Sequence, residues 1–368
     1  MTSHISRKQK ICFIIHSLGI GGMERVMSLI ISHIAQKSDV ETHLVLIGLK
    51  RELIQTVPES TIIHKPDWAF DNSKRTLCTL KTITFIRSTI KNINPDSILS
   101  FGEMWNNLVL LALRGCNYPV YVSDRSRPNK DLGRYQNYLR DKLYPKASGF
   151  IAQTKKGKDV AVQRKWNDNI TIIGNPVPVI EGKAERKPYI LNVGRFIKTK
   201  NIDQLLEIFS SVSEDPKYKQ WRLKIVGGDA HTLNITEKIK LQAQQLGITE
   251  KVDFEGEQNE VVPYYLEGEI FAFTSTSEGF PNALAEAMAA GLAVIAYDCI
   301  AGPSDLIDDG INGFLIPEGD EQLYTEKLEI LMHDSSLREQ FGIAAKEKVK
   351  QFEAEKIAKK FLDTILDQ

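Results

Sequence analysis

The sequence has few cysteines and no long apolar run. Cys12, Cys78, Cys116 and Cys299 form no Cys-x-x-Cys pair and no spacing typical of metal ligands. They are therefore expected to be reduced thiols rather than a disulfide framework or a zinc site. No apolar run reaches the ~18 residues that a membrane span needs, and the apolar segment 11–15 is too short for a signal peptide. We therefore expect a cytoplasmic protein.

The chain also lacks a net charge, because 47 Lys and Arg residues balance 47 Asp and Glu residues. The charge is nevertheless unevenly distributed. Residues 1–180 carry 26 basic and 14 acidic side chains, a net charge of +12, and residues 181–368 carry 21 and 33, a net charge of −12. Residues 125–165 alone carry twelve basic and three acidic side chains. This segment is either an ordinary solvated surface or a site of peripheral contact with an anionic membrane. No recognition motif accompanies the charge, so we expect no nucleic-acid partner.

A glycine-rich turn near the N-terminus lacks the full dinucleotide-binding fingerprint. Gly21 and Gly22 follow an apolar strand and precede a helix, but the third glycine of the fingerprint is replaced by Glu24. The next strand ends at Gly48 without an acidic residue. Both departures argue against NAD binding. The two glycines therefore either shape a strand-to-helix turn or leave backbone N–H groups at the helix start for a phosphate.

The length of 368 residues predicts two domains. The apolar content of 42% and charged content of 26% are typical of globular proteins. Short apolar runs alternate with helical stretches, which predicts α/β architecture with parallel sheets covered on both faces. The Pro-rich polar stretch 175–188 is the clearest linker. We place the first domain at residues 1–178 and the second at 179–353.

The most informative stretch is 269–297, which reads as strand, turn, helix and strand. Residues 270–274 and 292–297 are apolar runs of buried-strand length. Between them, Pro281 is expected in the first helical turn, and Gly291 supplies a left-handed stop.

Two carboxylates and an amide surround the start of this helix. Glu278 lies in the loop after the first strand, and Asn282 and Glu286 are four residues apart on one helix face. Open α/β sheets bind ligands at this position, beyond the carboxyl ends of their strands.

The segment from Glu278 to Glu286 resembles the E-x7-E motif of retaining glycosyltransferases of family 4, which have the two-domain GT-B fold. The sequence also matches the continuation of that motif at Gly291, Gly302-Pro303-Ser304, Asp309-Gly310 and Asn312-Gly313-Phe314-Leu315. The resemblance implies two Rossmann-like domains whose parallel sheets face a central cleft. In this arrangement residues 1–178 form the acceptor side, the final helix 354–368 crosses back to it, and residues 179–353 bind a nucleotide-sugar donor.

A basic loop precedes this stretch in the second domain. Arg195 and Lys200 resemble the family's pair that holds the donor diphosphate, and Asn201 stands where the family often has glycine. The chemistry suits a departing nucleoside diphosphate, because fixed cations stabilise the charge that develops on its oxygens. The alternative is two solvated basic residues in a turn.

The resemblance also implies roles for the remaining site residues. Glu278 would accept hydrogen bonds from donor-sugar hydroxyls, and Glu286 would bind ribose hydroxyls. The other donor-binding residues would be Gly21 and Gly22 over the diphosphate, Gly256 at the base, and Phe280, Pro281 and Asn282, whose N–H groups would orient the sugar and phosphate.

Two loops of the first domain are candidate acceptor sites. The loop 101–107 carries Glu103 with an indole and amides, a mixture that suits a sugar. The loop 123–128 lies where many family members have a histidine near the reacting sugar, but this chain has Asp124 and Arg125. Either residue could contact the acceptor, or the two could form a salt bridge.

No Asp-x-Asp motif suited to a metal–diphosphate bridge occurs in the sequence. We therefore expect no metal and no cofactor, with Arg195 and Lys200 replacing a cation. The expected activity is transfer of a sugar from a UDP-sugar, either a UDP-N-acetylhexosamine or a UDP-hexose, to a glycan or lipid-diphosphate-linked glycan. Three alternatives remain open: a GT-B sugar-nucleotide epimerase, a non-catalytic nucleotide-sugar-binding subunit, and a dinucleotide-dependent dehydrogenase.

Overall fold

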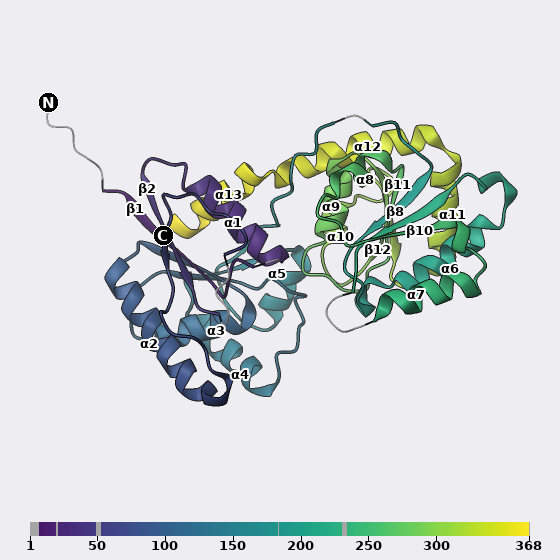
Figure 1. Ribbon diagram of the computed structural model, residues 1–368. Helices are drawn as coiled ribbons and strands as arrows, with labels where there is room; N and C mark the ends of the chain where they lie inside the picture. Colours follow the sequence, from purple (N-terminus) through teal and green to yellow (C-terminus); the bar gives the residue numbers. More distant parts are fainter. Residues whose placement is uncertain (1–6, 20, 49–52, 183, 230–233, 368) are drawn as a thin grey trace, which may run out of the picture. The chain divides into compact units, whose positions relative to one another are not determined.

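The computed structural model describes residues 7–19, 21–48, 53–182, 184–229 and 234–367. The chain divides into two compact units. The first contains Met1–Pro176 and Ala354–Gln368, and the second contains Val177–Glu353. Figure 1 shows the elements of both units in the colours of the sequence.

The first unit is built on a seven-stranded sheet in the order β3-β2-β1-β4-β5-β6-β7, and all of its strand pairs are parallel. The strands are β1 (Gln9–Ile15), β2 (Val40–Leu46), β3 (Ile62–His64), β4 (Ser97–Phe101), β5 (Val120–Ser123), β6 (Gly149–Ala152) and β7 (Ile170–Ile172). The chain starts at β1, builds outward to β3, and then returns to β4 on the other side of β1. The sheet therefore has a topological switch point between β1 and β4.

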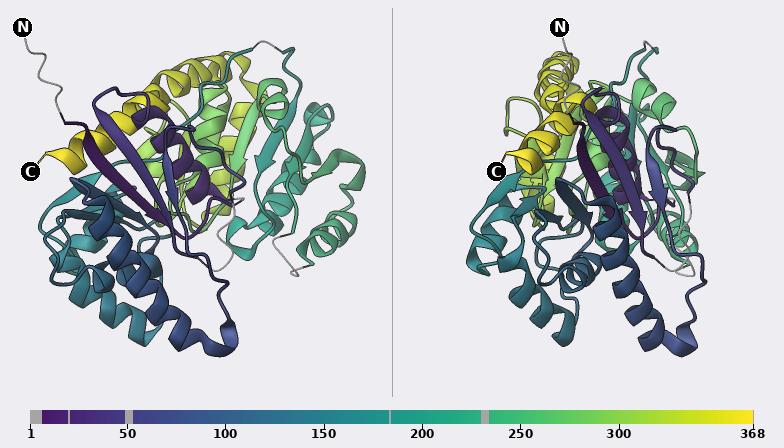
Figure 2. Two further views of the ribbon diagram at one scale, coloured as in Figure 1. Left: turned by 60° about the vertical axis from the view of Figure 1, so that its left-hand side comes forward. Right: turned by 90° about the vertical axis from the view of Figure 1, so that its left-hand side faces the viewer.

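Helices cover both faces of this sheet, as right-handed crossovers require when the direction of strand addition reverses. They are α1 (Gly22–Ile34), α2 (Arg75–Ile93), α3 (Glu103–Ala112), α4 (Arg134–Leu143), α5 (Lys155–Gln163) and α13 (Ala354–Leu366), with 3-10 turns η1 (Asn72–Lys74) and η2 (Tyr144–Lys146). The yellow α13 packs beside the purple α1 (Figure 1, Figure 2). Ile357, Phe361 and Ile365 of α13 are fully buried, and Phe361 lies 5.9 Å from the ring of Phe101.

The second unit has a six-stranded parallel sheet in the order β10-β9-β8-β11-β12-β13. Its strands are β8 (Tyr189–Val193), β9 (Arg222–Val226), β10 (Val252–Gly256), β11 (Ile270–Phe273), β12 (Ala293–Asp298) and β13 (Phe314–Pro317). The order of addition reverses after β10, so the switch point of this sheet lies between β8 and β11.

Two hydrophobic clusters cover the two faces of the second sheet. One is formed chiefly by α6, α7 and α11, and the other by α8, α9 and α12. The helices are α6 (Ile202–Ser213), α7 (Ile235–Gln245), α8 (Val262–Glu267), α9 (Asn282–Ala289), α10 (Pro303–Leu306), α11 (Glu321–His333) and α12 (Ser335–Val349), with 3-10 turns η3 (Lys198–Lys200), η4 (Pro216–Tyr218), η5 (Thr249–Lys251) and η6 (Lys350–Phe352). Among the described residues, no helix combines the length and apolarity needed to cross a bilayer.

Candidate active site

The predicted donor-site loops of the second unit lie along one edge of its sheet. Arg195 and Lys200 follow β8, and Glu278 follows β11. Because β8 and β11 are adjacent parallel strands, their carboxyl ends open at the same edge, at the switch point where doubly wound sheets bind ligands.

Lys200 and Glu278 form an ion pair at this edge. The Lys200 Nζ lies 2.6 Å from Glu278 Oε1, and the two side chains are only 19% and 14% exposed. The two loops are also joined through the backbone. The Thr274 hydroxyl donates to the Lys200 carbonyl at 3.1 Å, and the Thr276 N–H donates to the Thr199 carbonyl at 2.8 Å. The ammonium and the carboxylate are therefore held in a fixed, partly dehydrated position.

Asn201 adopts the left-handed backbone conformation, with φ of 54°. Glycine prefers this conformation, and asparagine is one of the few other residues that tolerates it. The Asn201 side chain also donates a hydrogen bond to Gln204 Oε1. The departure from the family's usual glycine therefore preserves the backbone geometry of the Lys200 loop.

The loop of Arg195 continues along the edge toward β9 and β10. Arg195 is exposed, and its neighbour Phe196 donates its N–H to the Gly228 carbonyl at 2.8 Å. Gly227 has a φ of +145°, and a Cβ there would collide with the Gly194 carbonyl. The Gly227 N–H in turn donates to the Gly256 carbonyl at 2.8 Å. Glycine at 227 thus allows the loops after β8, β9 and β10 to approach closely.

Gly256, the predicted base-site residue, ends β10 with a φ of +70°. A side chain added there would meet nothing within 4 Å. The residue therefore borders open space at the same edge as Lys200.

The helix that carries the second carboxylate begins one residue later than expected. Pro281 is the N-cap of α9, not a residue of its first turn. Pro281 has no N–H, and the Asn282 N–H donates to the Phe280 carbonyl at 2.9 Å. The predicted N–H contribution is therefore wrong for Pro281, and the N–H of Asn282 is engaged within the loop. Phe280 is buried and packs edge-on against Phe352.

Glu286 lies on the second turn of α9. It accepts a hydrogen bond from the hydroxyl of Tyr265 at 3.2 Å. Tyr265, in α8, is completely buried. This tyrosine orients the carboxylate, and no motif in the sequence indicated it.

In the first unit, Gly21 is the N-cap of α1 and Gly22 is its first residue, with no side chain capping the helix. A Cβ at Gly21 would collide with the carboxylate of Glu24. Glu24 instead pairs with His16, with Oε1 and Nε2 3.1 Å apart. The His16 ring stacks on Trp105 with centroids 5.7 Å apart and an interplanar angle of 5°. The residue that replaces the third glycine thus belongs to a local cluster around the turn.

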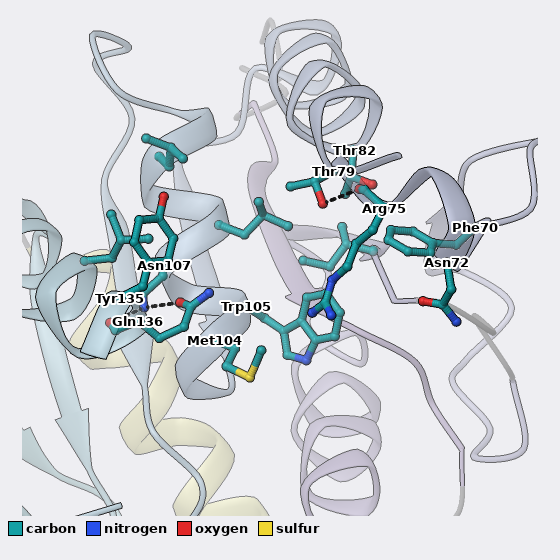
Figure 3. A pocket seen from close by; sticks show the side chains of 14 residues that line it. Phe70, Asn72, Arg75, Thr79, Thr82, Met104, Trp105, Asn107, Tyr135 and Gln136 are labelled. Atoms are coloured by element: carbon teal, nitrogen blue, oxygen red, sulfur yellow. Dashed lines mark hydrogen bonds between the residues drawn. The ribbon is translucent and has the colours of Figure 1, made fainter. Parts of the chain in front are cut away.

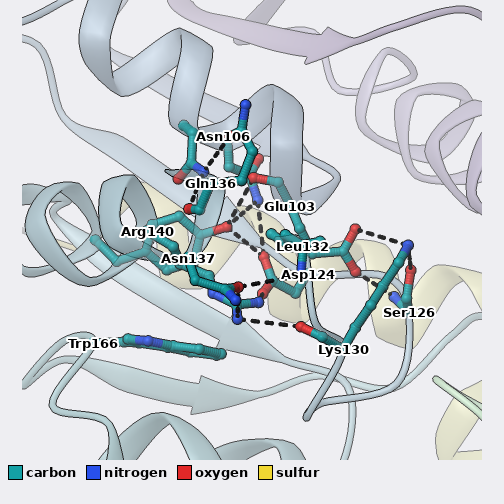
Figure 4. A network of polar contacts seen from close by, with 12 residues as sticks. Glu103, Asn106, Asp124, Ser126, Lys130, Leu132, Gln136, Asn137, Arg140 and Trp166 are labelled. Carbon is teal, nitrogen blue, oxygen red and sulfur yellow. Dashed lines mark hydrogen bonds and ion pairs between the residues drawn. The ribbon is translucent and has the colours of Figure 1, made fainter. Parts of the chain in front are cut away.

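The predicted acceptor residues of the first unit form a buried polar network (Figure 4). Glu103 accepts a hydrogen bond from the Ser126 N–H at 2.8 Å. Asp124, only 7% exposed, accepts hydrogen bonds from the Tyr144 hydroxyl at 2.5 Å and from Asn106 Nδ2 at 3.2 Å. Its second oxygen lies 3.7 Å from the Arg140 guanidinium.

Arg125 is directed elsewhere in this network. It donates to Asn175 and to Ser123 Oγ, and its guanidinium lies 4.4 Å from the centroid of the Phe101 ring. The alternative of a salt bridge between Asp124 and Arg125 is therefore wrong, because Asp124 pairs with Arg140. Both residues are committed to contacts that hold the ends of β4 and β5 together.

Burial and the nearby charge of Glu103 raise the pKa of Asp124 to about 7. Burial also raises the pKa of Tyr144 well above its usual value, and the charge of Asp124 adds to the effect. Folding therefore favours the protonated form of the Asp124 carboxyl group, because burial disfavours its charged form.

Two doubly wound parallel sheets, each with polar loops at its switch point, define the GT-B class of two-domain enzymes. Solved structures confirm this fold. The Anabaena protein HepE in complex with UDP superposes with a TM-score of 0.81 over 98% of this chain and 100% of that chain, at 17% identity.

The sequence comparisons identify the activity within this class. Residues 177–348 match the family described as Glycosyl transferases group 1. The chain is 27% identical to the N-acetylgalactosamine-N,N'-diacetylbacillosaminyl-diphospho-undecaprenol 4-alpha-N-acetylgalactosaminyltransferase of Campylobacter jejuni subsp. jejuni, over 97% of this chain and 100% of that protein. It is 26% identical to the amylovoran biosynthesis glycosyltransferase AmsD of Erwinia amylovora, over 94% and 96% of the two chains. The protein is a glycosyltransferase with the GT-B fold.

Proposed function

We propose that this glycosyltransferase moves a sugar from a UDP-sugar, either a UDP-N-acetylhexosamine or a UDP-hexose, to a lipid-diphosphate-linked glycan during polysaccharide or glycan assembly. One observation carries the donor half of the proposal. Lys200 and Glu278 are fixed 2.6 Å apart at the switch point of the second sheet, where one ligand with a diphosphate and hydroxyls could contact both. The name of the Campylobacter relative, which includes a diphospho-undecaprenol acceptor, supports the acceptor half.

Each residue at the edge has a defined task in this proposal. Lys200 and the exposed Arg195 stabilise the charge that develops on the diphosphate as the glycosidic bond breaks. Glu278 accepts hydrogen bonds from the sugar hydroxyls, each contributing about 1.5–3 kcal/mol. Glu286, held by Tyr265, binds the ribose, and Gly256 borders the base.

We assign the reaction to the retaining class, with Glu278 and Glu286 as the E-x7-E pair of family 4. The support is the match of the whole segment from Glu278 to Leu315, not the spacing of the two carboxylates. Proton NMR of the first product formed from an α-linked UDP-sugar tests this assignment. A β-linked product would refute it.

The proposed reaction needs no metal ion, because Lys200 supplies a fixed cation at the site. We expect full activity in excess EDTA. Complete loss of activity in EDTA, restored by Mn²⁺, would refute metal independence and leave the transfer reaction itself intact.

A lipid-linked acceptor places the enzyme at a membrane surface. Of the twelve basic residues between 125 and 165, Arg140 is buried in the polar network, and Arg125 and Lys130 are half-buried. The exposed ones are Arg127, Arg134, Lys142, Lys146, Lys155, Lys156, Lys158, Arg164 and Lys165. Each basic residue near an anionic surface contributes about 1 kcal/mol. We therefore propose peripheral contact through this segment at the cytoplasmic face.

Co-sedimentation with liposomes tests this contact. Replacing Lys155, Lys156 and Lys158 with Glu should weaken binding to phosphatidylglycerol-containing liposomes but not to neutral ones. Equal binding of the variant and the wild type to the anionic liposomes would argue against the membrane contact.

The decisive experiment for the whole proposal is a calorimetric or thermal-shift screen against UDP- and GDP-sugars, followed by an assay with a synthetic polyprenyl-diphosphate glycan. We expect one UDP-sugar to bind and its sugar to appear on the acceptor. Conversion of the sugar-nucleotide without acceptor would instead indicate an epimerase. Binding without turnover would favour a non-catalytic subunit.

A further inference from the structure

A cavity of about 330 Å³ lies within the first unit, between α2, α3 and α4 (Figure 3). Apolar side chains from α3, α4 and two neighbouring loops form much of its wall: Ile47, Phe70, Trp105, Leu108, Leu111 and Leu139. None of the residues that line it is acidic. The volume and the largely apolar lining are typical of a small-ligand site.

The polar side chains in this wall already have hydrogen-bond partners within the protein. The hydroxyls of Thr79 and Thr82 donate to backbone carbonyls of the preceding turn of α2, at 2.8 and 2.9 Å. The Nδ2 of Asn107 donates to the carbonyl and to the Oε1 of Gln136, at 3.0 and 2.9 Å. A ligand rich in hydroxyls would therefore find few free partners in the wall, and burying its polar groups there would be costly.

Arg75 differs from these residues, because its side chain is a cation without a partner. It is exposed at the first residue of α2, and it extends toward Trp105 (Figure 3). Within the described part of the chain, its guanidinium forms neither an ion pair nor a hydrogen bond. An unpaired guanidinium beside an apolar wall without acidic residues favours an anionic group, above all a phosphate.

An apolar chain that ends in an anionic group is the complement of this arrangement. The acceptor of the proposed function has this chemistry, since its isoprenoid chain is joined to a diphosphate. We infer that the cavity binds the isoprene units nearest the diphosphate of the lipid-linked acceptor, and that Arg75 binds the diphosphate. This inference rests on the proposed function, because it names the part of the acceptor that is recognised in addition to the sugar.

The position of the cavity suits an acceptor. Trp105 lines it, and the indole stacks on the ring of His16 with centroids 5.7 Å apart. His16 directly follows β1, at the switch point between β1 and β4, where doubly wound sheets bind ligands. The cavity therefore adjoins the switch point, so a chain in the cavity and a sugar at the switch point can belong to one acceptor molecule.

Isothermal titration calorimetry on the wild-type protein tests the inference, with farnesyl diphosphate as the probe. Saturating UDP is present, so that the probe cannot bind at the donor site through its diphosphate. We expect farnesyl diphosphate to bind at least about a hundredfold more tightly than inorganic diphosphate, because each buried methylene favours binding about fourfold. Equal affinities would show that the chain is not bound and would overturn the inference.

A second comparison distinguishes the acceptor from a membrane phospholipid. Lauroyl lysophosphatidylglycerol also has an apolar chain, but its phosphodiester carries a single negative charge. With both probes below their critical micelle concentrations, farnesyl diphosphate should bind at least about threefold more tightly, because its diphosphate brings more charge to Arg75. Equal or tighter binding of the lysolipid would assign the cavity to a membrane lipid and would overturn the inference.

One pair of variants tests the cation. Arg75→Gln should weaken the binding of farnesyl diphosphate at least about tenfold, because a charged hydrogen bond to the diphosphate is lost. Lys91→Gln removes a charge from the same helix at an exposed residue that does not line the cavity, so it should leave binding unchanged. Equal loss in the two variants would contradict the role of Arg75.

A second pair tests the wall. Thr79→Phe fills part of the cavity and should weaken the binding of farnesyl diphosphate at least about tenfold, because fewer methylenes can then be buried. Thr84→Phe is the matched control. Thr84 is an exposed threonine of the same helix whose hydroxyl also donates to the preceding turn, at 3.1 Å, but it does not line the cavity. Equal affinities of these two variants would show that the chain lies elsewhere.

Titration with UDP alone separates this inference from the proposed function. If UDP binds but farnesyl diphosphate has no advantage over inorganic diphosphate, the cavity assignment fails and the donor site stands. If UDP and UDP-sugars do not bind, the proposed function fails. The comparison of the Thr79 and Thr84 variants still decides whether the cavity holds the chain.

Discussion

Replacing Lys200 with Met should lower both the stability of the fold and the rate of sugar transfer. The substitution keeps the length of the side chain but removes the ammonium 2.6 Å from Glu278 Oε1. Because both groups are largely buried, the lost charged hydrogen bond should cost about 1.5–3 kcal/mol of folding stability. Loss of a fixed cation beside the departing diphosphate should lower kcat about 10²–10³-fold. The Kd for UDP should rise as well, since the same cation faces the bound diphosphate.

The matched control is Lys198→Met. Lys198 lies in the same 3-10 turn but is exposed, so its replacement should change kcat less than threefold and stability by less than about 0.5 kcal/mol. Radiolabel transfer gives kcat, calorimetry gives the Kd for UDP, and urea unfolding gives stability. If Lys200→Met keeps kcat and the Kd for UDP within threefold of the wild type while the Glu278 pair is lost, the ligand role assigned to Lys200 is wrong.

Three further predictions concern the architecture around the site. Asn201→Val should destabilise the protein by about 1–2 kcal/mol relative to Asn201→Gly, because only the β-branched residue is strained at a φ of 54°; equal melting temperatures would contradict this. Gly227→Ala should cost at least about 2 kcal/mol by urea unfolding, because the new Cβ meets the backbone at Gly194, whereas Gly228→Ala meets only an ordinary contact and should be nearly neutral. The pKa of Asp124 rises from 3.8 to about 7 on folding, so its contribution to stability is fully present below pH 4 and is lost as the pH rises to 7. Asp124→Asn should therefore be more stable relative to the wild type at pH 7.5 than at pH 5, and an unchanged difference between these pH values would refute the shifted titration.

The sequence predicted the parts of the fold that depend on local pattern. Buried parallel strands are short apolar runs, so the runs 270–274 and 292–297 located β11 and β12 to within a residue. The strand β3 was missed, because Ile62–His64 is a short edge strand with two exposed residues. Its pairing with β2 depends on contacts made in the folded sheet, and a segment of three residues has too little pattern to predict it.

The candidate active site likewise has features that the sequence predicted and features that it did not. The adjacency of Lys200 and Glu278 could be predicted, because the Rossmann-like topology that the resemblance implied places the strands before these two residues side by side. Burial of Asp124 does not follow, because it depends on Tyr144 and Arg140 from distant segments. The hydrogen bond from Tyr265 to Glu286 and the hydrogen bonds from Asn107 to Gln136 could not be predicted either. Single polar residues in amphipathic helices carry no pattern that would distinguish them.

The return of α13 to the first unit has a consequence for biosynthesis. The side chains of Ile357, Phe361 and Ile365 fill the space beside α1 and β4, yet they are translated only after every strand of the second unit. While the chain is still on the ribosome, the first unit must therefore leave an apolar groove open to solvent, and the nascent protein needs protection there until its last helix emerges.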